Sequence, residues 1–92
     1  MPTMPGRLVT KLEVGDLVRL RGREWTIEAW GEGREDGRWE GWLVFVPADG
    51  NPPLATPRET TQSSRQALTY WATGLASTYL EGAFTRAIAR AA

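Results

Sequence analysis

The spacing of hydrophobic residues along the chain changes near residue 55. Before this point apolar and polar positions alternate, most clearly over residues 17–30, and this alternation predicts β-strands. After it the apolar positions recur every three or four residues, which is the period of an α-helix. In 92 residues the two halves must share one core. We therefore expect a single α+β domain over residues 1–92, with a β part at 7–56 and a helical part at 57–91.

The stretch LVRLRGREWTIEAW at residues 17–30 predicts a β-hairpin with a two-residue turn. Gly22 stands at the first central position of this turn, where a type II′ turn needs a positive φ, and Arg23 follows it. Directly opposed residues share a face of a sheet, so the apolar residues should gather on the core side and the charged ones in solvent. The expected cross-strand pairs are Leu20 with Trp25, Val18 with Ile27, Arg19 with Thr26 and Arg21 with Glu24.

A second hairpin is expected around the glycine-rich segment GEGREDG at residues 31–37. The segment RWEGWLVFV at 38–46 should form the central strand, because its β-branched and aromatic residues are apolar on both faces. We expect Gly41 to form a bulge in that strand and residues 8–12 to add a short strand or an arm. The C-terminal helices should cover the face of the central strand that the sheet leaves open.

The helical half contains two sets of start signals with a stop between them. Residues 56–59 (TPRE) have the pattern of a capping box with Pro at the first helical position, which predicts a first helical turn there. Gly74 followed by an apolar residue predicts a helix stop of the Schellman type, and residues 78–81 (TYLE) form a second capping box. Two helices broken near Gly74 are therefore expected, and one long helix through this glycine is the alternative.

The segment LEVGDLV at residues 12–18, followed by the turn at Gly22, resembles the first hairpin of SH3-like and Tudor-like small barrels. Such barrels often open with a GD-x-V strand, and the likeness extends over residues 12–46. It implies a partly open antiparallel barrel of about five strands, on which the two helices would pack. Barrels of this kind bind peptides or extended chains at aromatic residues beside their loops. The resemblance implies a fold and no particular activity.

Residue types that common catalytic chemistry requires are missing from the sequence. It contains no histidine and no cysteine, which removes the usual general base, the usual metal ligand and the thiolate nucleophile. The carboxylates around residues 31–37 do not have the spacing of a calcium loop, and a strand follows this segment, whereas a helix follows a phosphate-binding glycine loop. We therefore expect a protein that is not an enzyme, with no catalytic residue, no metal and no cofactor.

Charge and hydropathy narrow the expected location and partners. The formal net charge is zero, whereas a dedicated nucleic-acid binder usually carries an excess of Lys and Arg. The charge is uneven: residues 1–23 carry five positive and two negative side chains, and residues 24–50 carry seven negative and two positive ones. No apolar run reaches the ~20 residues of a membrane-spanning helix. We expect a cytoplasmic protein without membrane contact.

Arginines and tryptophans are the candidate binding residues. Three tryptophans flank the second hairpin loop, and each could pack in the core or stand exposed; three arginines lie in the first hairpin. The first hypothesis is an interaction module that binds a protein partner or itself. The alternative is a nucleic-acid-binding accessory protein in which the arginines act with a nearby tryptophan. A purely structural component of an oligomer or virion is a third possibility. The candidate residues are Arg19, Arg21, Arg23, Trp30, Trp39 and Trp42.

Overall fold

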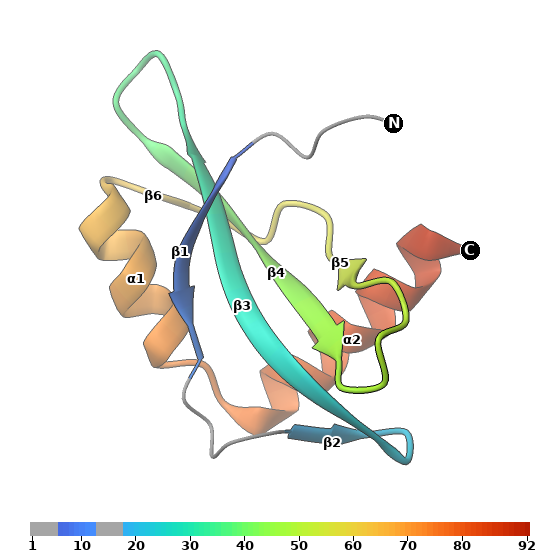
Figure 1. The fold of residues 1–92 in the computed structure, drawn as a ribbon. Coiled ribbons are helices and arrows are strands. Elements are labelled where there is room, and N and C mark those ends of the chain that lie inside the picture. The colour runs from blue at the N-terminus through green and yellow to red at the C-terminus, as the bar shows by residue number, and fades with distance from the viewer. Residues whose placement is uncertain (1–5, 13–17) are drawn as a thin grey trace.

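The computed structural model describes residues 6–12 and 18–92, which form six strands followed by two helices (Figure 1). Both helices come after all the strands, and both pack on the sheet that the strands form. The α+β class predicted from the sequence is therefore confirmed. The elements are β1 (Arg7–Lys11), β2 (Val18–Leu20), β3 (Arg23–Gly33), β4 (Trp39–Pro47), β5 (Leu54–Ala55), β6 (Thr60–Gln62), α1 (Arg65–Thr73) and α2 (Ser77–Ala91).

The strands belong to one antiparallel sheet built around the long β3–β4 hairpin. β1 and β2 pair one after the other with the same edge of β3, and β5 and β6 do the same along the far edge of β4. The sheet does not close into a barrel within the described residues, and both helices lie on one of its faces, behind the sheet in Figure 1. The Gly-Asp pair at residues 15–16, part of the likeness to SH3-like barrels, lies outside the described residues.

The first hairpin turns at Arg21 and Gly22, one residue earlier than predicted. Both residues have positive φ angles, 52° and 75°, as a type I′ turn requires. The predicted type II′ turn and its cross-strand pairs are therefore wrong. The pairing is displaced by two positions, and because side chains alternate, Trp25 and Ile27 stay on the core side, where both are buried. The observed pairs are Val18 with Trp25, Arg19 with Glu24 and Leu20 with Arg23.

The second hairpin has a shorter loop than its glycines suggested, because β3 continues to Gly33. The Gly37 N–H donates to the Arg34 carbonyl at 3.0 Å, and Gly37 has a φ of 86°, which closes the tight turn between β3 and β4. The bulge predicted at Gly41 is wrong, because Gly41 lies in regular register opposite Gly31.

The facing glycines of β3 and β4 make a depression in the sheet that holds Leu68 of α1. A Cβ atom at either Gly31 or Gly41 would collide with the Leu68 side chain, which is completely buried. The two glycines therefore allow the helix to approach the sheet backbone closely. This contact holds α1 against β1, β3, β4 and β6.

Residues 56–59 do not begin a helix, so the first predicted capping box is wrong. The Thr56 side chain is fully buried, and its hydroxyl accepts a hydrogen bond from the Leu43 N–H at 3.0 Å. The residues that follow pair with β4 as β6. The unpaired edge of β4 offers backbone hydrogen bonds that a threonine-rich segment accepts readily, so the β part extends beyond residue 56 to Gln62.

The break between two helices near Gly74 is confirmed. α1 begins after Ser64, whose Oγ accepts a hydrogen bond from the Ala67 N–H at 3.0 Å. It ends at Gly74, which has a φ of −99° and so does not form the predicted Schellman stop, which needs a left-handed residue. α2 begins at Ser77, ahead of the second predicted capping box, and no side chain caps it.

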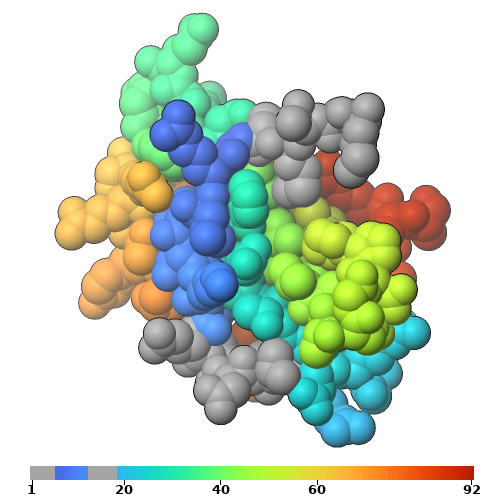
Figure 2. All heavy atoms as spheres, viewed as in Figure 1, coloured from blue at the N-terminus to red at the C-terminus, as the bar shows by residue number. Residues whose placement is uncertain are grey.

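The main core lies between the sheet and the helices and centres on Phe84 of α2. Phe84 makes edge-to-face contacts with Trp25 and Phe45, at centroid distances of 4.9 Å and 5.2 Å. On the opposite face of β4, Trp42 and Val44 are also buried. Figure 2 shows this face, where side chains of β1, β3 and β4 lie side by side and the β4–β5 connection borders them. The helices thus cover one face of the central strand, and packing on the other face completes its burial.

Candidate functional site

The three candidate arginines lie at the β2–β3 turn, where all three are exposed. The Arg21 guanidinium lies over the Phe84 ring, 5.9 Å from its centroid, and so covers the end of the main core. Arg23 Nε lies 3.9 Å from the Asp49 carboxylate. A shallow hollow of about 380 Å³ beside Arg19 and Arg23 is also lined by Glu24 and Asp49. Carboxylates therefore lie beside these arginines. We name the three residues Arg19, Arg21 and Arg23 the arginine turn.

The three candidate tryptophans are divided between the two faces of the sheet. Trp30 and Trp42 lie directly opposite each other on the face away from the helices, and Trp42 is only 5% exposed. The Arg58 guanidinium stacks over Trp42 at 5.0 Å from the ring centroid. Trp39 lies on the helix face, with the Arg65 guanidinium 5.8 Å from its ring centroid. Trp30 and Trp39 are half-buried, so these rings mainly pack within the fold.

The arginine turn and the tryptophans do not form one surface. Arg23 begins β3 and Trp30 lies towards its other end, about 24 Å away along the strand. The tryptophan nearest to the turn in sequence is Trp25, which is 4% exposed and donates its indole N–H to the Leu20 carbonyl. The hypothesis that arginines and a tryptophan act together requires an exposed indole ring beside the arginine turn, and the buried Trp25 does not provide one.

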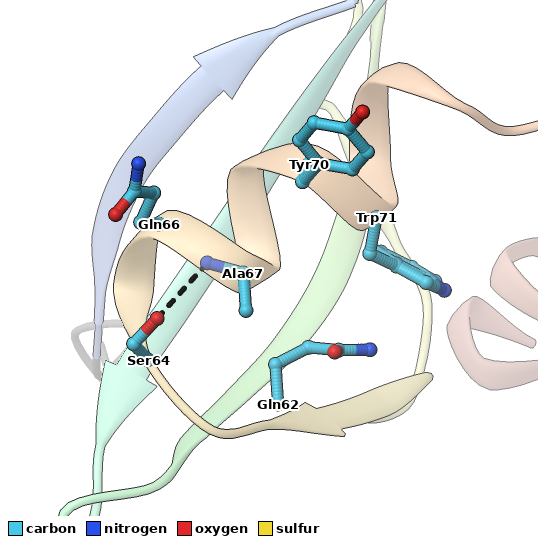
Figure 3. Close-up of a pocket in the computed structure, with 6 residues that line it drawn as sticks. All are labelled: Gln62, Ser64, Gln66, Ala67, Tyr70 and Trp71. Carbon is cyan, nitrogen blue, oxygen red and sulfur yellow. Dashed lines mark hydrogen bonds between the residues drawn. The ribbon is translucent and has the colours of Figure 1, made fainter.

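A larger hollow than the one at the arginine turn lies between β6 and α1 and measures about 480 Å³. In Figure 3 the Gln62 side chain rises from β6 into this space, and Ala67 and Trp71 point into it from α1. Tyr70 stands at the rim and is 83% exposed. We name this surface the β6–α1 hollow; its lining residues are Gln62, Ser64, Gln66, Ala67, Tyr70 and Trp71.

The aromatic side of the hollow is supported from behind by a hydrogen-bonded cluster. Trp71 makes an edge-to-face contact with Tyr79 of α2, at a centroid distance of 6.0 Å. The Tyr79 hydroxyl donates to the Glu59 carboxylate at 2.6 Å, and the Arg86 guanidinium donates to both oxygens of the same carboxylate at 3.0 and 2.6 Å. Since Glu59 directly precedes β6, the cluster joins β6, α2 and the base of the hollow.

The protonation states of this cluster follow from its burial and hydrogen bonds. The Glu59 side chain is only 5% exposed. Burial alone raises the pKa of Glu59, but the hydrogen bonds from Arg86 and Tyr79 outweigh it and hold the pKa below its usual value. Burial, assisted by the hydrogen bond to Glu59, raises the pKa of Tyr79 to about 12. At neutral pH the carboxylate is therefore charged and the phenol keeps the proton that it donates.

Sequence reasoning missed most of this site for two reasons. Residues 60–62 were included in the helical part predicted at 57–91, so their place at a sheet edge was not foreseen. Trp71 belongs to an apolar stripe at helical spacing (Leu68, Trp71, Ala72 and Leu75), which by itself predicts a place in the core, and Trp71 does pack against Tyr79 there. Tyr70 carried the available signal, because it is an aromatic residue that falls outside that stripe.

Comparisons with protein-family models, with curated proteins and with solved structures find no match for this chain. In the described segments, no group of three or more His, Cys, Asp or Glu side chains could hold a metal ion. Neither α1 nor α2 is long and apolar enough to cross a membrane. The candidate site must therefore be interpreted from its own shape and chemistry.

Proposed function

We propose that this protein is a non-enzymatic interaction module that binds an extended protein segment at the edge of β6 and in the β6–α1 hollow. The observation that carries the proposal is the hollow itself, which lies next to a sheet edge and has the 83% exposed Tyr70 at its rim. A strand added to a sheet edge gains backbone hydrogen bonds, and a neighbouring pocket can accept its side chains. Both elements of this recognition mode lie together here.

The composition of the lining supports a polypeptide ligand. It consists of two amides, one hydroxyl, two aromatic rings and one methyl group, without a charged side chain. Amide and hydroxyl groups both donate and accept hydrogen bonds, which suits the alternating donors and acceptors of an extended backbone. Because β6 has only three residues, its hydrogen bonds alone would hold a partner weakly. Binding must therefore draw on Tyr70 and the hollow as well.

Nucleic-acid binding through Arg19, Arg21 and Arg23 is the weaker alternative. Exposed arginines support it, but Glu24 and Asp49 lie in the same shallow hollow, and their charges oppose the approach of a phosphate. The resemblance to SH3-like barrels and the expected cytoplasmic location remain parts of the proposal. They rest on the sequence, and the open antiparallel sheet is compatible with the former.

A photo-crosslinking experiment tests the proposed surface. Tyr70 is replaced by the photoreactive p-benzoylphenylalanine in the full-length chain, and the protein is irradiated in extract from its native cells. We expect a covalent adduct with a protein chain, with the attached peptide identified by mass spectrometry. Thr85, an exposed residue of α2, is the control position for the same probe. The proposal fails if position 70 yields no adduct, or only the adducts that position 85 yields.

A further inference from the structure

The side chains of β6 are uncharged and divide between its two faces. Thr61 lies opposite Glu40 and is exposed, whereas Thr60 and Gln62 lie on the other face, where Gln62 lines the hollow. The Gln62 amide nitrogen donates to the Thr60 hydroxyl at 2.7 Å, so these two side chains already form a matched donor and acceptor. The segment Thr60–Gln62 is therefore complementary to a reversed copy of itself.

From this pattern we infer that the partner at β6 is a second copy of this chain, with the two β6 strands paired antiparallel across a two-fold axis at Thr61. The inference rests on the proposed function, since it names the occupant of the same surface. Thr61 of one copy then faces Thr61 of the other, a favourable cross-strand pair. Thr60 lies opposite Gln62 of the second copy, so the hydrogen bond inside each strand is exchanged for one between strands. A two-fold interface requires such reciprocal contacts.

Charge also favours a second copy over a charged partner. A two-fold axis places each residue near its own image, so a surface with one sign of charge repels itself. The lining of the β6–α1 hollow contains no charged side chain. The charged residues just before β6 are already paired: Arg58 with Glu32 and Glu40, and Glu59 with Arg86. Two copies can therefore approach without bringing unpaired like charges together at this edge.

The size of the surface predicts a reversible dimer. Three-residue strands form few hydrogen bonds, and the main apolar contribution comes from the exposed Tyr70 of each copy, because an aromatic side chain can bury on the order of 150–250 Å². Pairing of the strands brings both β6–α1 hollows beside the axis. Such a contact lies below the roughly 800 Å² per partner of a stable complex. The dimer should therefore form and dissociate with concentration.

A single cysteine on the proposed axis provides a direct test, because the chain contains no native cysteine. In a Thr61→Cys variant the two thiols of a dimer would lie directly opposite each other, within the Cα separation that a disulfide spans. We expect this variant to form a disulfide-linked dimer at least about tenfold faster than Thr85→Cys under the same mild oxidation. Equal rates for the two exposed positions would overturn the inference.

Sedimentation velocity of the unmodified chain and of Thr61→Lys provides the second readout. The unmodified chain should shift from monomer to dimer between about 1 µM and 1 mM. Thr61→Lys should remain monomeric with unchanged thermal stability, because two lysines would meet on the axis, while Thr85→Lys should still dimerise. A monomer at every concentration, or a dimer that persists in Thr61→Lys, would refute the inference.

Failure of this inference is separable from failure of the proposed function. If the chain stays monomeric while the Tyr70 probe captures a different protein, the second copy is excluded and the binding surface stands. If the Tyr70 probe captures neither a second copy nor another protein, the surface itself is excluded. An adduct between two copies of this chain, lost in Thr61→Lys, supports both.

Discussion

The two edge strands that lie beside α1, β1 and β6, differ in how they are protected. β1 carries Arg7 and Lys11 at its ends and has an irregularity between Leu8 and Thr10, and the Arg65 guanidinium donates to the Leu8 carbonyl at 3.3 Å. Positive charges and bulges are common means of preventing edge-to-edge pairing. β6 reads Thr-Thr-Gln and carries no charge. Only its short length limits pairing, and an open hollow with an exposed aromatic ring adjoins it.

This comparison indicates which of the two edge strands lacks charged protection. Both edges belong to the same sheet and both lie beside α1, so proximity to the helix does not distinguish them. The difference lies in where α1 directs its residues: Arg65 reaches β1, whereas Ala67 and Trp71 face β6. One helix therefore places a positive charge at one edge and lines an open hollow beside the other.

The largest expected effect comes from removing the contact that positions α1 between the two edges. Leu68→Ala should destabilise the protein by about 2–5 kcal/mol, because it empties the space above Gly31 and Gly41. Urea unfolding measures the change. Gln66→Ala, an exposed residue of the same helix, should stay within about 0.5 kcal/mol. If Leu68→Ala costs no more than this control, Leu68 does not anchor the helix; Leu68→Val gives a milder test should the first variant not fold.

The next effect concerns the carboxylate that ties β6 to α2. Glu59→Gln should cost about 1–3 kcal/mol, because it weakens the hydrogen bonds from Arg86 and Tyr79 to a buried group. Thermal unfolding at neutral pH measures the loss. Glu81→Gln changes an exposed carboxylate of α2 and should have little effect. The same loss in both variants would contradict the role of Glu59.

The pH dependence of stability sharpens this prediction. The folded-state pKa of Glu59 lies below its ordinary value of 4.5. Its charged form therefore stabilises the fold fully above that value, and the stabilisation is lost as the pH falls through the folded-state pKa. The unmodified chain should lose stability on acidification below about pH 5 more steeply than Glu59→Gln. Parallel profiles for the two proteins would show that the carboxylate is not titrating as expected.

A smaller effect on stability, but an informative one, follows from removing the protection of β1. Arg65→Ala with Lys11→Thr should change the free energy of unfolding by no more than about 0.5 kcal/mol. In a Thr61→Lys background, which blocks β6, this change should restore association, because Arg7 is then the one charged side chain that remains on β1. Light scattering measures this association. Arg34→Ala with Arg38→Thr removes the same charge at the hairpin tip and should not restore association; equal association in both would attribute the effect to net charge alone.

The smallest effect is expected at the arginine turn. Arg21→Glu with Arg23→Glu should leave dimerisation and the Tyr70 adduct unchanged, because these residues do not line the β6–α1 hollow. The same variant tests the nucleic-acid alternative with a fluorescent single-stranded oligonucleotide. Binding that falls steeply with salt in the unmodified chain and is lost in the variant would favour that alternative.

Several features of the fold could be predicted from local patterns alone. The alternation around Trp25 and Ile27 placed both in the core. This placement is correct although the predicted turn is wrong, because the observed register differs from the predicted one by two positions, which leaves each side chain on the same face. The helix break at Gly74 was also foreseen, since glycine weakens a helix wherever it stands. The error at Arg21 has a physical reason: a left-handed arginine is unfavourable locally, and its contact with Phe84 of α2 lies outside the reach of any local pattern.

The candidate site was less predictable, because its parts come from distant segments. Residues 56–59 match a helix start in sequence, yet Thr56 satisfies the Leu43 N–H and Glu59 pairs with Arg86, 27 positions along the chain. Gly41 was read as a bulge because nothing in the sequence reveals that it faces Gly31 and receives Leu68. The candidate arginines and tryptophans were identified by residue type, and only the register of β3 separates them.

By itself, the sequence determined the α+β class, the order of strands and helices and the identity of the core residues in β3 and β4, because these depend on the local period of apolar positions. The tertiary structure alone decided that Thr60–Gln62 becomes a strand, that α1 lies between two unlike sheet edges, and that Trp71 and Tyr70 border an open hollow. Those outcomes depend on hydrogen bonds and packing between segments far apart in the chain, and local propensity does not encode such contacts.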